Sequence, residues 1–175
     1  LVLTDDGPVI AVAGSSSVEE SRDTRQVHLL GLGADSWQNL ATVTPADLGV
    51  DRIEKPALWT DGSTIHLAGL SHTESLTTSA WMLSGTRDAL GSPAALEQTG
   101  RLLGHVAPRF TAAGEAVWAQ VDESDGIVVC RGTGADSSCI DTEATYLDGL
   151  AITDGGVLVS TRTAGSPWAL AEIPW

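Results

Sequence analysis

Carboxylate and imidazole side chains lie close together at two points in the sequence. Asp61 precedes His66 in the stretch LWTDGSTIHLAGL at residues 58–70, and His72 precedes Glu74 in a polar loop. A carboxylate beside an imidazole can orient a general base, as hydrolases require. Asp61 is followed by Gly62, however, and Asp-Gly is also a turn signal. The role of the first pair therefore depends on the elements around it.

Asp-Gly pairs recur along the chain, with the aspartate at positions 6, 61, 125, 148 and 154. Glycine supplies the positive φ that tight turns need, and aspartate bonds its own backbone, so turn formation is sufficient to explain the pairs. His28 and His66 lie in apolar runs beside leucine, which favours structural roles for both. We expect His72 to be the histidine available at a functional site.

Motifs of common catalytic and cofactor sites are absent from the sequence. It contains no Gly-x-Ser-x-Gly elbow, phosphate loop, dinucleotide fingerprint or His-Glu-x-x-His. A serine–histidine–acid triad could be assembled from distant positions, but sequence spacing does not reveal one. The segment DESDG at residues 122–126 is far shorter than a calcium loop and is better explained as a hairpin turn. We expect no metal and no cofactor, with a surface calcium ion at residues 122–126 as the alternative.

The charge balance argues against two classes of partner. There are 23 acidic and 9 basic residues, which gives a net charge of −14. Nucleic acids and anionic membranes are bound through clustered lysine and arginine, and no apolar run is long enough to span a bilayer. We therefore expect neither nucleic-acid binding nor membrane insertion. The scattered acids are explained by solubility, and attraction of a cation or a basic partner is the alternative.

The two cysteines, Cys130 and Cys139, flank a glycine-containing turn in VVCRGTGADSSCID. The runs on either side predict a hairpin, across which the two thiols can meet if the register places them opposite each other. Two cysteines without further cysteine or histidine nearby cannot complete a tetrahedral metal site. We predict a Cys130–Cys139 disulfide, and hence a secreted, periplasmic or cell-surface protein; free buried thiols are the alternative.

Short runs rich in β-branched and aromatic residues dominate the chain. They occupy residues 9–13, 26–30, 64–70, 79–83, 116–121, 126–130 and 157–160. Helical candidates are limited to one turn at residues 45–48 and a segment at residues 92–98 with Pro93 at its first helical position. The sequence therefore predicts an all-β fold.

The turn before each apolar strand repeats four times, with Gly7, Gly62, Gly114 and Gly155 about 40 to 55 residues apart. Each unit continues with a polar loop, a second apolar strand, another turn and a weaker strand, which residues 96–103 supply in the second unit. Four short antiparallel strands in a unit of this length are typical of a β-propeller blade. The predicted blades are residues 1–44, 55–103, 107–142 and 147–175.

The stretch PALWTDGSTIHLAGL resembles the Pro-x-Trp-Ser-Pro-Asp-Gly-x-x-Ile-x-Phe element of TolB-type and WD40-like β-propellers. The matching residues are Pro56, Trp59, Asp61, Gly62 and Ile65. Thr60 stands in place of the Ser-Pro pair, so the element is one residue shorter. The resemblance implies a β-propeller or partial propeller of about four blades, without identifying a family within it. A β-sandwich is the alternative.

The fourth predicted unit is one strand short, and the first begins with its inner strand. Because an unpaired edge is a liability, we expect further blades or another chain to supply the missing strand. The alternative is an unrecognised strand in a loop, such as residues 47–53. Residues 1–7 already have the pattern of a strand and a turn, so we expect a mature, trimmed or partial chain.

In the propellers that the chain resembles, ligands lie on the face made by the loops between second and third strands and by the links between blades. The predicted contact residues on that face are Glu19, Glu20, Arg22, Asp23, His72 and Glu74. The first of these loops is long and charged, as functional loops often are. Asp61 and Gly62 would lie on the opposite face, which makes that pair structural.

Six tryptophans are many for a chain with one phenylalanine and one tyrosine. We expect Trp59, Trp81 and Trp118, which lie in strands, to pack between blades. Exposed indoles among Trp37, Trp168 and Trp175 could stack on sugar rings or mark a protein contact.

We predict an extracytoplasmic binding or scaffold propeller that recognises a protein or a carbohydrate, rather than an enzyme. The alternatives are a hydrolase, glycosidase-like or peptidase-associated, and a regulatory propeller of a larger multidomain protein.

Overall fold

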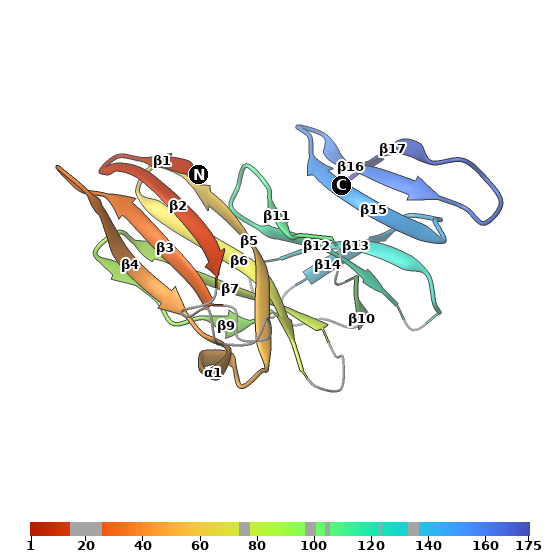
Figure 1. Cartoon of the computed structure of the whole chain (residues 1–175). Helices are drawn as coiled ribbons and strands as arrows, with labels where there is room; N and C mark the ends of the chain where they lie inside the picture. The colour runs from red at the N-terminus through yellow and green to blue at the C-terminus, as the bar shows by residue number, and fades with distance from the viewer. Residues whose placement is uncertain (15–25, 74–77, 97–100, 104–105, 123, 133–136) are drawn as a thin grey trace.

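The computed structural model describes residues 1–14, 26–73, 78–96, 101–103, 106–122, 124–132 and 137–175. These residues form four antiparallel sheets that follow one another along the chain, together with one helical turn (Figure 1). The fold is therefore all-β, as the strand pattern predicts.

Sheets A and B are formed by the first half of the chain. Sheet A consists of β1 (Val2–Thr4), β2 (Gly7–Gly14), β3 (Gln26–Leu32) and β4 (Trp37–Val43). The helical turn α1 (Pro45–Leu48) leads to sheet B, which consists of β5 (Arg52–Thr60), β6 (Thr64–His72), β7 (Thr78–Thr86), β8 (Ala89–Leu90) and β9 (Ala94–Ala95). Both β8 and β9 pair with β7, at different positions along the same edge of that strand.

Sheets C and D are formed by the second half. Sheet C consists of β10 (Arg101–Leu102), β11 (Arg109–Phe110), β12 (Ala116–Val121), β13 (Ile127–Gly132) and β14 (Ser137–Asp141). Sheet D consists of β15 (Tyr146–Ile152), β16 (Gly156–Arg162) and β17 (Ala169–Pro174). Because β10 and β11 both pair with β12, together they take the place of a first strand in sheet C.

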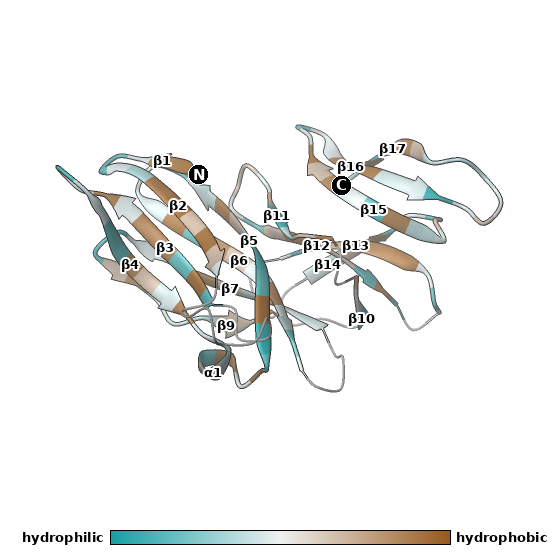
Figure 2. Ribbon diagram, viewed as in Figure 1, coloured by the Kyte–Doolittle hydropathy of each residue, from teal (hydrophilic) through white to brown (hydrophobic). Residues whose placement is uncertain are grey.

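Apolar clusters fill the space between each pair of successive sheets. Two of them join sheets A and B, and in one of these Val9 and Leu29 of sheet A pack with Ile65 of sheet B. Leu70 of sheet B meets Trp118 of sheet C in the next cluster. A further cluster joins sheets C and D and includes Val117, Val129, Leu147 and Val157. Brown apolar segments alternate with polar ones along the strands (Figure 2), which is the pattern expected of strands that bury one face against a neighbouring sheet.

The Asp61–Gly62 pair forms the turn between β5 and β6. Asp61 Oδ1 accepts hydrogen bonds from the backbone N–H groups of Ser63, at 3.0 Å, and Thr64, at 2.7 Å. The bond from Thr64 is the main reason that the pKa of Asp61 is lowered. Gly62 has a φ of 107°, which favours glycine. The carboxylate is therefore engaged in the turn, as the structural interpretation of this pair predicts.

His66 and His28 both have structural partners. His66 Nδ1 is 2.8 Å from Ser84 Oγ, and its ring packs edge-on against Trp59 with centroids 5.0 Å apart. Burial lowers the pKa of His66, against the weaker opposing effect of Asp61. His28 Nδ1 lies 3.1 Å from Thr42 Oγ1 on the neighbouring strand.

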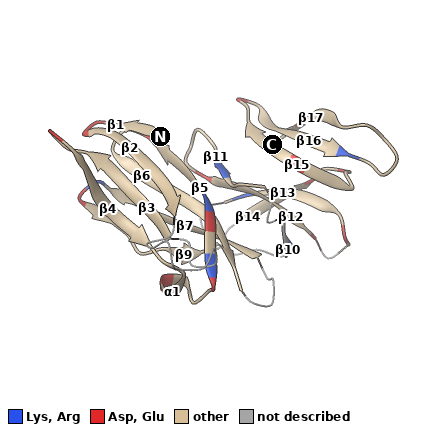
Figure 3. Ribbon diagram, in the orientation of Figure 1, with Lys and Arg blue, Asp and Glu red and all other residues tan. Residues whose placement is uncertain are grey.

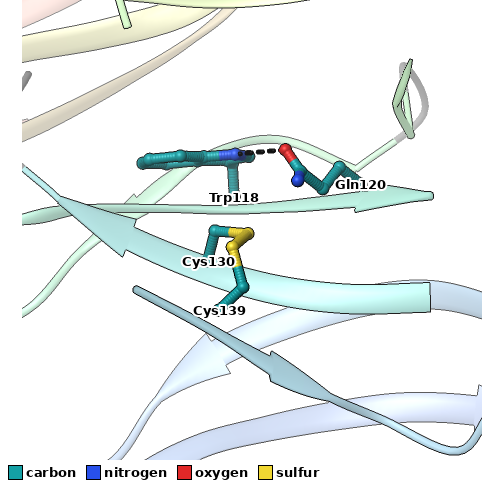
Figure 4. The surroundings of a disulfide bond; sticks show 4 residues. All are labelled: Trp118, Gln120, Cys130 and Cys139. Carbon is teal, nitrogen blue, oxygen red and sulfur yellow. Dashed lines mark hydrogen bonds between the residues drawn. A yellow bond between two sulfur atoms is a disulfide. The ribbon is translucent and has the colours of Figure 1, made fainter. Parts of the chain in front are cut away.

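The predicted disulfide between Cys130 and Cys139 is present in sheet C (Figure 4). The two residues are directly opposite each other on β13 and β14, and Trp118 is opposite Cys130 on β12. The indole N–H of Trp118 donates to Gln120 Oε1 at 3.1 Å, and both side chains are buried. The disulfide therefore joins two strands next to the buried tryptophan of the sheet.

Two expectations for residues 92–103 are wrong. Ala94–Ala95 forms β9 instead of part of a helix, and the N–H of Leu96 donates to the carbonyl of Ala80. Pairing with β7 overrides a helical propensity that is too short to persist alone. Arg101 and Leu102, which were expected in the last strand of sheet B, pair instead with β12 of sheet C. The one-turn helix at residues 45–48 is confirmed, with the backbone N–H of Thr44 donating to the carboxylate of Asp47.

Charged residues are spread over strands and turns of all four sheets and are not confined to one of them (Figure 3). Among the described residues, no helix is long and apolar enough to cross a membrane.

Candidate functional site between sheets C and D

A hollow of about 330 Å³ lies between sheets C and D. Its walls come from the turn before β12, the end of β13, the turn between β15 and β16, and the residue after β17. The lining residues are Thr111, Ala112, Ala113, Glu115, Arg131, Ile152, Thr153, Asp154 and Trp175. Positive, negative, hydroxyl and aromatic groups therefore converge on one space.

Arg131 stands between an aromatic ring and a carboxylate in this hollow. The carbon at the centre of its guanidinium lies 4.7 Å from the centre of the Trp175 ring. One of its terminal nitrogens is 3.7 Å from Glu115 Oε2. The Arg131 and Glu115 side chains are 34 % and 35 % exposed, so solvent weakens the attraction between them. The same exposure lets a ligand displace the water around them. Stacking on the ring limits the orientations of the guanidinium.

The turn at residues 111–115 positions Glu115. The N–H of Gly114 donates to the Thr111 carbonyl, and the N–H of Glu115 donates to Thr111 Oγ1 at 3.1 Å. Gly114 has a φ of 80°, and a Cβ atom there would lie 2.7 Å from the Trp59 ring. The turn therefore requires glycine for both its backbone angle and its contact with sheet B.

Backbone and side-chain bonds hold the opposite wall. The N–H of Thr153 donates to the carbonyl of Gly156, and its hydroxyl donates to Glu172 Oε1 at 2.8 Å. The N–H of Trp175 lies 3.4 Å from the carbonyl of Gly155. The backbone of Trp175 is thus bonded to the same turn that carries Asp154.

Of the six predicted contact residues, His72 lies within the described part of the chain. It is at the end of β6, away from this hollow. Its Nε2 is 3.0 Å from Glu54 Oε1, and its Nδ1 is 3.0 Å from Thr78 Oγ1. Burial lowers the pKa of His72 although Glu54 opposes that shift. The neutral imidazole therefore donates from Nε2 to Glu54 and accepts from the Thr78 hydroxyl at Nδ1.

This hydroxyl–imidazole–carboxylate arrangement has the order of groups found in a catalytic triad. Thr78 is buried, however, so its hydroxyl is not accessible to a substrate. The arrangement instead connects β5, β6 and β7 at one end of sheet B.

The other predicted contact residues lie outside the described part of the chain. They are Glu19, Glu20, Arg22, Asp23 and Glu74. The contact surface that they were expected to form with His72 stays a prediction.

Asp122 and residues 124–126 lie in the hairpin turn between β12 and β13. Asp122 Oδ1 accepts hydrogen bonds from the hydroxyl and N–H of Ser124, at 2.7 and 2.9 Å, and from the N–H of Gly126, at 2.9 Å. The Ser124 hydroxyl is the main cause of the lowered pKa of Asp122. Across the described ranges, no group of three or more histidine, cysteine, aspartate or glutamate residues is arranged to hold a metal ion.

The hollow was not predicted from the sequence. It lies at the turns of Gly114 and Asp154, which correspond in the repeat to Asp61–Gly62 and were therefore expected on the face opposite the ligand loops. Trp175 carried a signal, because an indole outside the strands can contact a sugar or a protein. Arg131 and Glu115 carried none, since they are brought together by the pairing of β12 with β13.

No protein-family model matches the chain, and no curated protein matches it. Solved structures do resemble it. Trypanosoma rangeli sialidase is 10 % identical, with a TM-score of 0.59, over 98 % of this chain and 35 % of that chain. The same sialidase in complex with sialic acid matches at 10 % identity and a TM-score of 0.54, over 94 % of this chain and 33 % of that chain.

A mutant of that sialidase displaying trans-sialidase activity is 11 % identical, with a TM-score of 0.53, over 97 % of this chain and 34 % of that chain. The chain thus spans about a third of the length of the sialidases that it matches. At this identity the likeness shows the fold alone, and it does not identify a TolB or WD40 family. The four successive sheets and the structural matches together show that the chain has a β-propeller-like fold.

Proposed function

We propose that the chain is a carbohydrate-binding propeller domain and that its ligand site is the hollow between sheets C and D. The observation that carries the proposal is Arg131, held over the Trp175 ring and beside Glu115. Sugars present apolar ring faces together with many hydroxyl groups. An aromatic ring can stack on the apolar ring face of a sugar, while guanidinium, carboxylate and threonine hydroxyl groups form hydrogen bonds with the sugar hydroxyls.

The size of the hollow and the structural matches agree with this proposal. A volume of about 330 Å³ is at the small end of ligand sites, which suits one or two sugar rings. One of the matched sialidase structures holds sialic acid. The disulfide supports an extracytoplasmic location, where carbohydrate ligands are abundant.

A glycosidase is the second candidate, because Glu115 and Asp154 both line the hollow and glycoside hydrolysis uses two carboxyl groups. Glu115 already faces Arg131, which favours a binding role for it. Release of a chromophore from nitrophenyl glycosides by the wild-type protein, lost in both Glu115→Gln and Asp154→Asn, would support catalysis. Glycan binding without turnover would support the binding role.

We also propose that the four sheets are blades of a longer ring. The predicted boundaries are residues 1–44, 55–103, 107–142 and 147–175, except that the second blade ends before Arg101, because Arg101 and Leu102 pair with β12 of sheet C. The matched sialidases are about three times as long as this chain, which supports a larger assembly. A mass measurement in solution tests pairing between copies: a monomer at all concentrations would argue against another copy as the source of the missing blades.

A glycan array followed by calorimetry tests the proposed function. The wild-type protein should bind at least one glycan, and Trp175→Ala should weaken that binding by about tenfold or more through loss of the aromatic surface. Trp37→Ala is the matched control, since Trp37 is 43 % exposed on sheet A, away from the hollow. Binding that survives Trp175→Ala unchanged, or no binding to any glycan, would overturn the proposal.

A further inference from the structure

The hollow between sheets C and D carries more negative than positive charge. Among the described residues that line it, Glu115 and Asp154 are acidic and Arg131 is basic. The carboxylate of Glu172 adjoins the same wall, since it accepts the Thr153 hydroxyl at 2.8 Å. The whole chain has a net charge of −14. The electrostatic field in the hollow therefore favours a ligand that carries positive charge.

The positive charge of Arg131 is already compensated. One of its terminal nitrogens is 3.7 Å from Glu115 Oε2, and its guanidinium lies over the Trp175 ring. An acidic sugar that bound this guanidinium would have to displace Glu115. It would then lie beside two like charges, those of Glu115 and Asp154, which repel it. An acidic ligand is therefore disfavoured although the hollow contains an arginine.

The same contacts show how the hollow accommodates a cation. The guanidinium of Arg131 lies between an aromatic ring and a carboxylate, and both kinds of group stabilise positive charge. Asp154 is exposed, and no hydrogen bond or ion pair joins its carboxylate to another residue in the described ranges. Asp154 therefore offers a ligand a second carboxylate that no internal cation neutralises.

We propose that the hollow binds an amino sugar, with the sugar ring against Trp175 and its ammonium group directed to Asp154 and Glu115. The inference rests on the proposed carbohydrate-binding function and names the class of sugar that the same site takes. An ammonium group has three donors and no acceptor, so it pairs with carboxylates more strongly than a sugar hydroxyl does. Acetylation of the amine removes the charge and leaves the sugar ring in place.

Calorimetry with matched oligosaccharides at about pH 6, below the pKa of an ordinary amine, tests the proposal. The probes are β-1,4-linked tetramers of glucosamine and of N-acetylglucosamine, together with a tetramer of galacturonic acid. The glucosamine tetramer should bind about tenfold or more tightly than its acetylated form, because hydrogen bonds to charged groups are the stronger ones. The acidic tetramer should bind more weakly than both, and added salt should weaken the binding of the glucosamine tetramer alone.

Variants of the hollow connect this preference to its carboxylates. Asp154→Asn and Glu115→Gln should each lose most of the preference for glucosamine over N-acetylglucosamine, whereas Trp175→Ala should weaken the binding of both tetramers. Asp148→Asn is the matched control, because Asp148 is an exposed aspartate of β15 that does not line the hollow. It should keep the wild-type preference. Circular dichroism confirms that each variant is folded.

An acetylated tetralysine peptide separates recognition of an amino sugar from general attraction of cations, because it carries ammonium groups without sugar rings. The inference is overturned if the glucosamine tetramer does not bind, or if the acetylated sugar, the acidic sugar or the peptide binds as tightly. It is also overturned if folded Asp154→Asn and Glu115→Gln both keep the preference. If another sugar then binds in a way that depends on Trp175, the proposed carbohydrate function survives; if no glycan binds, both proposals fail.

Discussion

Reduction of the Cys130–Cys139 disulfide should lower the free energy of unfolding by about 2.6 kcal/mol. The bond joins residues nine positions apart. The entropy that such a loop removes from the unfolded chain is about 8.6 cal/mol/K, which corresponds to about 2.6 kcal/mol at 25 °C. The five paired positions between β13 and β14 remain after reduction, so we expect a less stable protein with the same fold.

Urea denaturation followed by tryptophan fluorescence, with and without reductant, measures this difference. The slope of the transition should change little while its midpoint falls. In thermal unfolding, the same loss corresponds to about 7 °C for a chain of this length. The double variant Cys130→Ala, Cys139→Ser should not respond to reductant. A difference below about 1 kcal/mol between the two forms would refute the loop-entropy reasoning.

Three further predictions follow from the contacts of His72, Gly69 and Glu115. The folded-state pKa of His72 is below its usual value of about 6.5, so the unfolded chain binds more protons and the free energy of unfolding should fall as the pH drops below about 6.5. Urea unfolding between pH 7 and pH 5 should show a smaller fall for His72→Gln than for the wild-type protein, and an equal fall in both would contradict this. Gly69→Ala would place a Cβ 2.5 Å from the buried Trp81 ring, so thermal unfolding should show a loss of about 1–3 kcal/mol, and unchanged stability would refute the overpacking. Glu115→Gln breaks a partly exposed ion pair with Arg131, so the free energy of unfolding should change by less than about 1 kcal/mol. Glycan binding should weaken in the same variant. A larger loss of stability would contradict the assignment of Glu115 to the site.

Local signals made several parts of the fold predictable from the sequence. Asp61 and Gly62 form a turn because the turn chemistry is contained within four residues. Cys130 and Cys139 form a disulfide because a short hairpin brings them opposite each other. Trp81 and Trp118 are buried, as expected of large apolar residues within strands.

The hollow between sheets C and D could not be predicted because its parts are distant in sequence. Arg131 and Trp175 come together only once sheets C and D have packed face to face. The strand at Ala94–Ala95 was missed for a related reason, since its pairing with Trp81 and Met82 depends on tertiary contacts and not on local propensity.

The indole N–H signals of a ¹⁵N-labelled sample, recorded during titration with the glycan that binds best, test the central claim most directly. Six tryptophans give six such groups, which single Trp→Phe variants assign. The signal of Trp175 should shift in proportion to occupancy, while those of Trp37 and Trp168 stay in place. Saturable glycan binding that leaves the Trp175 signal unmoved would contradict a carbohydrate site in the hollow between sheets C and D.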